Sequence, residues 1–130
     1  MSALPSIARY RTVQLKTSSP ADLLLLLYDG LLRFIGEARV AMVKGDRAVT
    51  GERISRAHAI LDELSATLNP KADAVLCERL FALYQFSMSR LLDANMKQTP
   101  DLLDEVIRVL SPLRDAWRVA AESNRMAAAG

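Results

Sequence analysis

The sequence is poor in the residues on which metal, disulfide and phosphate chemistry depend. Its 130 residues include one cysteine, one histidine and five glycines. The lone Cys77 cannot form an internal disulfide, so nothing indicates an oxidising compartment. His58 has Ser55 and Leu61 one helical turn away, whereas di-metal helical bundles use Glu-x-x-His pairs. The glycines are scattered and form no phosphate-binding loop.

The chain also lacks a block of one charge and a long uninterrupted apolar run. Its 17 Lys/Arg and 15 Asp/Glu residues are interspersed and leave a net charge of +2, which does not favour nucleic-acid binding. The start MSALPSIARYR has no apolar segment of the secretory type. The apolar run that begins at Leu23 meets Asp29 and Arg33, well short of the roughly 20 apolar residues that span a membrane. We therefore expect a cytoplasmic protein that binds no nucleic acid and does not insert into a membrane.

No combination of side chains predicts an active site. Cys77 would need a neighbouring base to act as a nucleophile, and His58 is expected on another helix. We expect Cys77 to be a buried, inert thiol. Asp29, between Tyr28 and Gly30, has no partner close in sequence, and we expect it to be solvated or to cap a docked segment. The sequence thus predicts a protein that is not an enzyme and has no metal site or cofactor.

What the chain has in abundance is apolar residues, 51% of the total, at helical spacing. We expect helices over about 20–44, 48–68, 72–96 and from 100 to about 126. Ser19-Pro20 and Thr99-Pro100 each place a capping hydroxyl before a first-turn proline. Gly45 is expected to end the first helix and Asn69-Pro70 the second. Pro112 is expected to kink the fourth helix.

Each expected helix carries one apolar seam with alternating spacings of three and four. Short connections between such helices predict an all-α fold, an antiparallel up-down four-helix bundle with a short N-terminal arm. We expect an arm over 1–17 that packs on the bundle, one domain over 18–126 and a frayed tail over 127–130. The seam of the first helix comprises Leu24, Tyr28, Leu31, Ile35, Ala38 and Met42; that of the third includes Leu76, Leu80, Leu83, Tyr84, Ser87, Leu91 and Ala94. Trp117 is expected in the core.

The first helix has more apolar residues than one seam can use. The five leucines from Leu23 to Leu27 cover the whole circumference of a helix, which turns about 100° per residue. Residues off the seams include Leu25, Leu27, Leu32, Phe34, Phe81 and Phe86. Either the core stripe is wide, or the surplus forms a groove for a partner's amphipathic helix. Gly30 and Gly36 allow the same two interpretations, as sites of tight packing within the bundle or of close approach by a partner.

Motifs spread from Tyr10 to Trp117 resemble those of the FliS family of flagellin-export chaperones. They are Tyr10 with Val13, Thr17-Ser18-Ser19-Pro20, Leu27-Tyr28-Asp29-Gly30, Ile60 to Leu64 with Leu68, Leu83-Tyr84, Leu91-Leu92, Ala94-Asn95, and Leu110, Leu113, Arg114, Ala116 and Trp117. The turn after the second helix, from Asn69 to Ala74, departs from the acidic, glycine-containing turn of the family. Arg79 stands where the family often has Asn.

The resemblance implies a cytoplasmic chaperone that binds the C-terminal segment of flagellin one to one and prevents its premature polymerisation. It also implies delivery to the flagellar type III export apparatus, including the gate component FlhA, without a cofactor. The residues we expect to bind flagellin are Ile7, Tyr10, Leu24, Leu27, Tyr28, Leu80, Tyr84 and Phe86. We expect the arm around Ile7 and Tyr10 to cover part of the groove when flagellin is absent.

Two other functions remain open on the sequence. The surplus apolar face could instead form a homodimer, which would make the chain a self-associating structural or adaptor protein. It could also lie on a membrane surface, although the basic residues do not line one polar face beside the leucines as such helices require.

Overall fold

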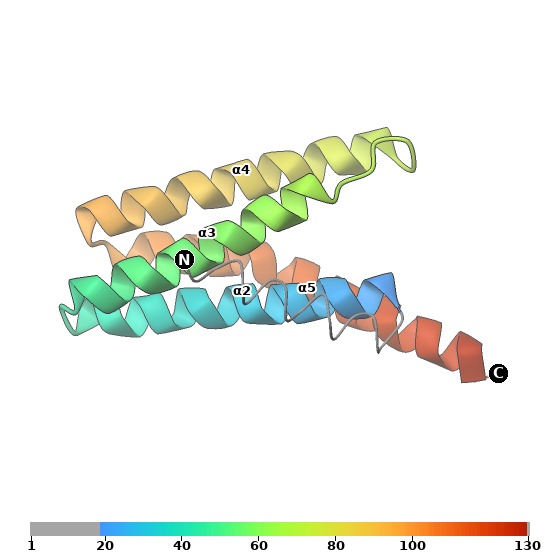
Figure 1. Ribbon diagram of the computed structural model, residues 1–130, viewed down its shortest axis with the longest axis horizontal. Coiled ribbons are helices and arrows are strands. Elements are labelled where there is room, and N and C mark those ends of the chain that lie inside the picture. The colour runs from blue at the N-terminus through green and yellow to red at the C-terminus, as the bar shows by residue number, and fades with distance from the viewer. Residues whose placement is uncertain (1–18, 130) are drawn as a thin grey trace.

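The structure, a computed structural model, describes residues 19–129, and these form four helices. They are α2 (Pro20–Val43), α3 (Arg47–Ala66), α4 (Ala74–Lys97) and α5 (Pro100–Ala129). Successive helices run antiparallel (Figure 1), and both α2 and α4 pack against α3 and α5. The predicted all-α four-helix bundle is therefore confirmed. The expected arm over 1–17, with Ile7 and Tyr10, lies outside the described residues.

The ends of α2 follow from its capping residues. The Ser19 hydroxyl oxygen accepts a hydrogen bond from the backbone N–H of Asp22 at 3.4 Å, and Pro20 occupies the first turn. Beyond the other end, Gly45 has φ of +81°, a conformation that favours glycine. These residues behave as the sequence predicted, since each cap depends only on near neighbours.

The connection from α3 to α4 is longer than expected, because α3 ends at Ala66 and α4 begins at Ala74. Asp73 caps α4 by accepting a hydrogen bond from the backbone N–H of Leu76 at 3.0 Å. The segment between them turns, with a hydrogen bond from the Ala72 N–H to the Asn69 carbonyl at 3.0 Å. Helix α4 therefore starts at the first effective cap, two residues later than the predicted start.

Helix α5 continues through Pro112 and remains helical to Ala129. Residues 127–129, expected as a frayed tail, are thus helical. The C-terminal end of α5 projects past the other helices (Figure 1). Arg125 holds it to the start of α2 through an ion pair with Asp22 at 2.7 Å.

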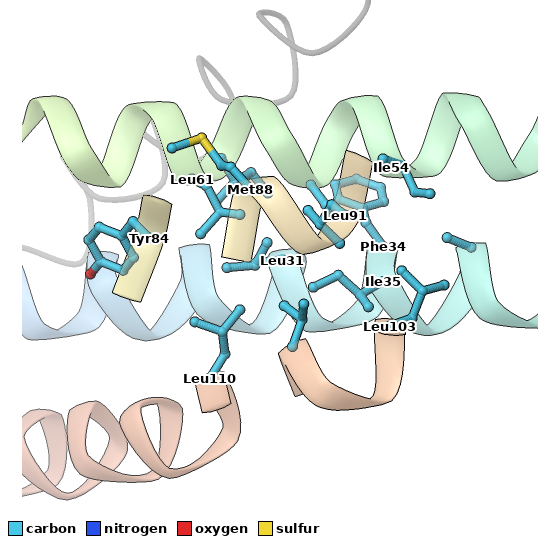
Figure 2. Packing of buried hydrophobic residues seen from close by; sticks show 14 of the residues in the cluster. Leu31, Phe34, Ile35, Ile54, Leu61, Tyr84, Met88, Leu91, Leu103 and Leu110 are labelled. Carbon is cyan, nitrogen blue, oxygen red and sulfur yellow. The ribbon is translucent and has the colours of Figure 1, made fainter. Parts of the chain in front are cut away.

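The core lies between the four helices, where Leu31, Leu61, Leu91 and Leu110 point toward one another (Figure 2). The stripe that α2 contributes is wide, which is one of the two interpretations of its surplus apolar residues. Leu27 and Phe34, assigned off the seam, are buried. The width has a simple cause, because α2 packs against two helices and so needs a broad apolar face.

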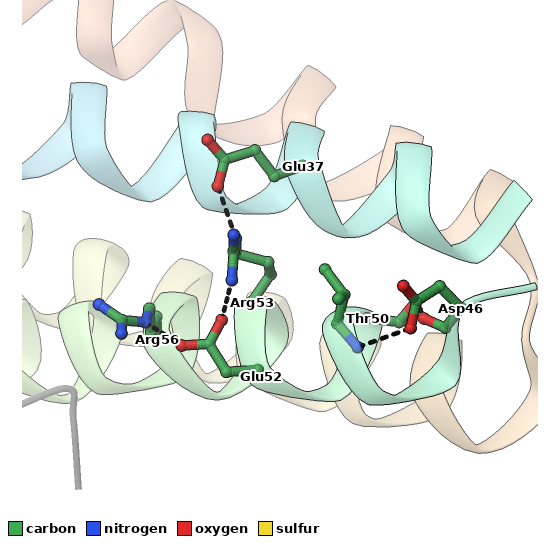
Figure 3. Close-up of polar contacts among 7 residues, drawn as sticks. Glu37, Asp46, Thr50, Glu52, Arg53 and Arg56 are labelled. Atoms are coloured by element: carbon green, nitrogen blue, oxygen red, sulfur yellow. Dashed lines mark hydrogen bonds and ion pairs between the residues drawn. The ribbon is translucent and has the colours of Figure 1, made fainter. Parts of the chain in front are cut away.

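Ion pairs connect the helices at the surface. Arg39 of α2 makes two hydrogen bonds to the Asp104 carboxylate of α5, at 2.6 and 3.1 Å. The Arg39 guanidinium lowers the pKa of Asp104 below its ordinary value. Arg53 of α3 binds Glu37 of α2 at 2.7 Å and also contacts its neighbour Glu52 (Figure 3). These pairs are partly exposed, so each contributes little beyond orienting the helices.

Candidate functional site

A groove of about 870 Å³ opens at the end of the bundle where α2 begins, α3 ends and α4 begins. On either side of the connection between α3 and α4, the apolar side chains of Leu68 and Leu76 stay partly or largely exposed. The apolar lining comes from all four helices and the connection: Pro20, Leu23, Leu24, Leu27, Leu64, Leu68, Ala72, Leu76, Cys77, Leu80, Tyr84 and Trp117. Thr67, Asn69, Glu63 and Asp73 complete it. In the described chain, the charged lining residues are therefore two carboxylates.

Two tyrosines pack at the base of the groove. The hydroxyl oxygens of Tyr28 in α2 and Tyr84 in α4 lie 2.7 Å apart in a buried hydrogen bond. Tyr84 lines the groove, whereas Tyr28 is fully buried behind it. The Trp117 ring packs against Tyr28 with centroids 6.4 Å apart. Because Trp117 is only half-buried and also lines the groove, its assignment to the core alone is corrected.

The hydroxyl pair gives a prediction for stability. Tyr28→Phe and Tyr84→Phe should each lower the free energy of unfolding by about 1–3 kcal/mol, because each leaves one buried hydroxyl without a partner. The double variant should cost less than the sum of the two singles, since it removes both groups. Urea denaturation of the four proteins measures this coupling, and strictly additive effects would show that the hydroxyls do not interact.

The same pair predicts how stability responds to alkaline pH. Burial raises the pKa of Tyr28 and of Tyr84 above their ordinary value. In the unfolded chain these hydroxyls lose protons above about pH 10, while the folded chain keeps them protonated. The free energy of unfolding should therefore be insensitive to this pair below pH 10 and should fall as the pH rises further. Urea midpoints measured across this range should fall less steeply in the double phenylalanine variant; equal slopes would contradict the assignment.

The structure brings together four of the residues predicted to bind a partner. Leu24, Leu27, Leu80 and Tyr84 all line the groove, with Tyr28 directly behind. Phe86 does not join them.

Phe86 is exposed on another side of α4, where the Arg90 guanidinium lies 5.0 Å from its ring centroid. It lies apart because it follows the groove residue Tyr84 by two positions, about 200° around the helix.

Sequence reasoning missed several lining residues, among them Leu23, Leu68 and Leu76, of which Leu76 had been placed in the apolar seam of its helix. Leu76 is 47% exposed and Leu68 half-buried, because the ends of α3 and α4 extend past the core. Cys77, expected to be buried, is half-buried in the groove wall. These residues could have been found from one sequence feature, an apolar seam that continues into the terminal turn of a helix, beyond the part that the core can cover.

The groove offers contact surface rather than reactive groups. Its one thiol has no imidazole beside it, since His58 pairs with Asp62 at 3.4 Å and does not line the groove. Over residues 19–129, no cluster of three or more His, Cys, Asp or Glu could hold a metal ion. None of the four described helices is long and apolar enough to cross a membrane.

Asp29, which was expected to be solvated or to cap a docked segment, is exposed and forms an ion pair with Arg114 of α5 at 3.0 Å. Gly36 is not tightly packed, since an added Cβ would meet nothing within 4 Å.

Together these features define a helical-bundle binding protein with an open apolar groove. Comparison with known proteins makes the class specific: residues 3–124 match the family model described as flagellar protein FliS. A flagellar secretion chaperone FliS of Bacillus subtilis is 34% identical over 116 residues, covering 89% of this chain and 86% of that protein. The flagellar secretion chaperone FliS of Vibrio cholerae is 29% identical, with 95% of each chain covered. The chain belongs to the FliS family.

Proposed function

We propose that the chain is a cytoplasmic flagellar export chaperone that binds the C-terminal segment of flagellin in the groove. By covering that segment, one chaperone per flagellin, it prevents premature polymerisation and delivers the client to the type III export apparatus and its gate component FlhA. The observation that carries the proposal is an open groove walled by leucines from three helices. The relatives' shared description as flagellar secretion chaperones supports a flagellar client.

The groove suits a client that is disordered before it binds. Burying apolar surface contributes about 25 cal/mol per Å², and ordering the client consumes part of this gain. The result is a large contact with moderate affinity, which is suitable for a cargo that must be released. The lining has few polar groups to satisfy, so an amphipathic segment can bury its apolar side there.

The test is a calorimetric titration of the full chain with the host's flagellin and with flagellin lacking its C-terminal region. We expect saturable one-to-one binding to the complete protein and none to the truncated one. Equal binding to both would place the contact elsewhere on flagellin. A stable dimer indifferent to flagellin would favour the self-associating structural protein instead.

We further propose that the arm around Ile7 and Tyr10 covers part of the groove until flagellin binds. Residues 1–17 lead directly into Pro20 and Leu23 at the groove wall. The arm carries Arg9, Arg11 and Lys16 and no acidic residue, whereas the described groove wall is charged only by two carboxylates. Attachment and charge therefore both favour this position.

Removing the arm should change the affinity for flagellin. A chain that starts at Thr17 should bind the C-terminal segment several-fold more tightly if the arm only competes, and more weakly if it also contacts the client. Calorimetry on the two chains measures the difference. An unchanged dissociation constant would exclude any role for the arm in the groove.

A further inference from the structure

The two walls of the groove differ in charge. The wall that α2 contributes is apolar and consists of Pro20, Leu23, Leu24 and Leu27. The opposite wall, formed by the end of α3 and the start of α4, also carries Glu63 and Asp73. Among residues 19–129, no lysine or arginine lines the groove. A segment in the groove therefore meets apolar surface on one side and carboxylates on the other.

We propose that the groove selects an amphipathic helical segment with a lysine or arginine at one edge of its apolar face, and that Glu63 and Asp73 make this selection. The inference rests on the proposed function, since it names the chemistry of the segment that the same groove binds. The basic side chain pairs with the carboxylates of α3 and α4, while the apolar face packs against the leucines. The asymmetry of the walls thereby sets the direction in which the basic edge of the segment faces.

The position of Glu63 is unfavourable for its own helix. It lies in the last turn of α3, which ends at Ala66 and contains no basic residue. The C-terminus of a helix carries a partial negative charge that repels a carboxylate and attracts a cation. The stability of α3 therefore does not account for a glutamate at this position. A cationic side chain in the groove is attracted both by the Glu63 carboxylate and by the end of α3.

Asp73 has a structural role that leaves it able to bind a second donor. One of its carboxylate oxygens accepts the hydrogen bond from the Leu76 N–H at 3.0 Å that caps α4. An ionised carboxylate has two acceptor oxygens, and Asp73 is exposed at the groove wall. Lys71, in the same connection, does not line the groove. Asp73 can therefore hold the start of α4 and bind a cation of the segment together.

The size of the groove limits this contact to a short segment. Its volume of about 870 Å³ is comparable to pockets of roughly 300–1,000 Å³ that hold single small molecules. It can bury a few large apolar side chains, which a helix presents on one face over about two turns. A lysine or arginine beside them can lay its apolar stem along the leucines while its charge reaches the carboxylates.

The N-terminal sequence contains the same combination of groups. Ile7 and Tyr10 alternate there with Arg9 and Arg11. The arm that we propose to cover the groove therefore offers it apolar and basic side chains, as the selected segment does. Arm and client compete for the groove through the same chemistry.

Two synthetic helical peptides test the selectivity without flagellin. Both have the same leucines on one face, and they differ at one edge position, which is lysine in one and glutamate in the other. We expect calorimetry to show that the full chain binds the lysine peptide at least about tenfold more tightly. The preference should disappear in the variant that combines Glu63→Gln with Asp73→Asn, because asparagine preserves the cap of α4 without the charge. Equal affinities, absence of binding by both peptides, or a preference that persists in this variant would overturn the proposal.

A reversed charge and a matched control make the assignment specific. Glu63→Lys should bind the glutamate peptide better than the lysine peptide, and a retained preference for lysine would contradict the role of Glu63. Glu78→Gln removes a carboxylate from an exposed position on α4 that does not line the groove, so it should keep the full preference. Added salt should reduce the preference of the unchanged chain, because it screens exposed charges.

Flagellin separates this inference from the proposed function. Glutamine in place of each lysine or arginine of its C-terminal segment, one at a time, should in at least one case weaken binding to the unchanged chain about threefold or more. The same substitution should have no effect on binding to the Glu63→Gln, Asp73→Asn variant. If the segment binds but none of these changes matters, the inference fails and the proposed function stands. If no flagellin binds while the lysine peptide is preferred, the proposed function fails and the selectivity of the groove stands.

Discussion

Leu76→Glu is expected to weaken binding of the flagellin C-terminal segment at least about 100-fold. Leu76 is 47% exposed and lines the groove from the first turn of α4, so the free chain tolerates a carboxylate there. When the client binds, that carboxylate must leave water for an apolar environment that offers it no partner. The loss should therefore appear in affinity and not in stability, and calorimetry measures it.

The adjacent residue provides a matched control. Val75 is 62% exposed, belongs to the same helix and does not line the groove. Val75→Glu adds the same charge one position away and should change the dissociation constant by less than about threefold. Circular dichroism should show equal helix content in both variants. If the two variants bind flagellin equally well, the client does not occupy this groove.

Leu31→Ala is expected to lower the free energy of unfolding by about 2–5 kcal/mol. The Leu31 side chain is fully buried in the core and points between the helices (Figure 2). Its removal loses buried apolar surface and leaves a cavity that the packed helices can close only partly. Because small domains have about 5–15 kcal/mol in total, this single change should shift the urea midpoint strongly.

An exposed apolar residue supplies the comparison for Leu31. Val119 on α5 is 61% exposed, so Val119→Ala should change the free energy of unfolding by no more than about 0.5 kcal/mol. Equal effects of the two substitutions would mean that Leu31 does not belong to a packed core.

Local features of the fold could be predicted from the sequence. The Ser19-Pro20 start of α2 and the Gly45 stop were predictable, because each depends on hydrogen bonding or backbone geometry within a few residues. The end of α3 and the start of α4 were displaced by two residues, since several polar residues between them could act as caps. Asp73 is the one that does so.

The position of the groove could not be predicted, because it depends on which helix ends meet. Periodicity placed Leu76 on the apolar seam of its helix but could not show that no neighbour covers it. Periodicity also could not decide between a wide core stripe and a partner surface at Leu27 and Phe34, which packing against two neighbouring helices buries. Phe86 was selected with Tyr84 by nearness in sequence, although the helix turns it away from the groove.

The emission of Trp117 tests the central claim most directly. It is the only tryptophan in the chain and lines the groove, so a client that enters the groove must change its surroundings. We predict that adding a tryptophan-free flagellin C-terminal segment shifts this emission, saturating at one segment per chain, and that Leu76→Glu abolishes the shift. Binding that calorimetry detects while the emission of Trp117 stays unchanged would contradict the account, because the client would then lie outside the groove.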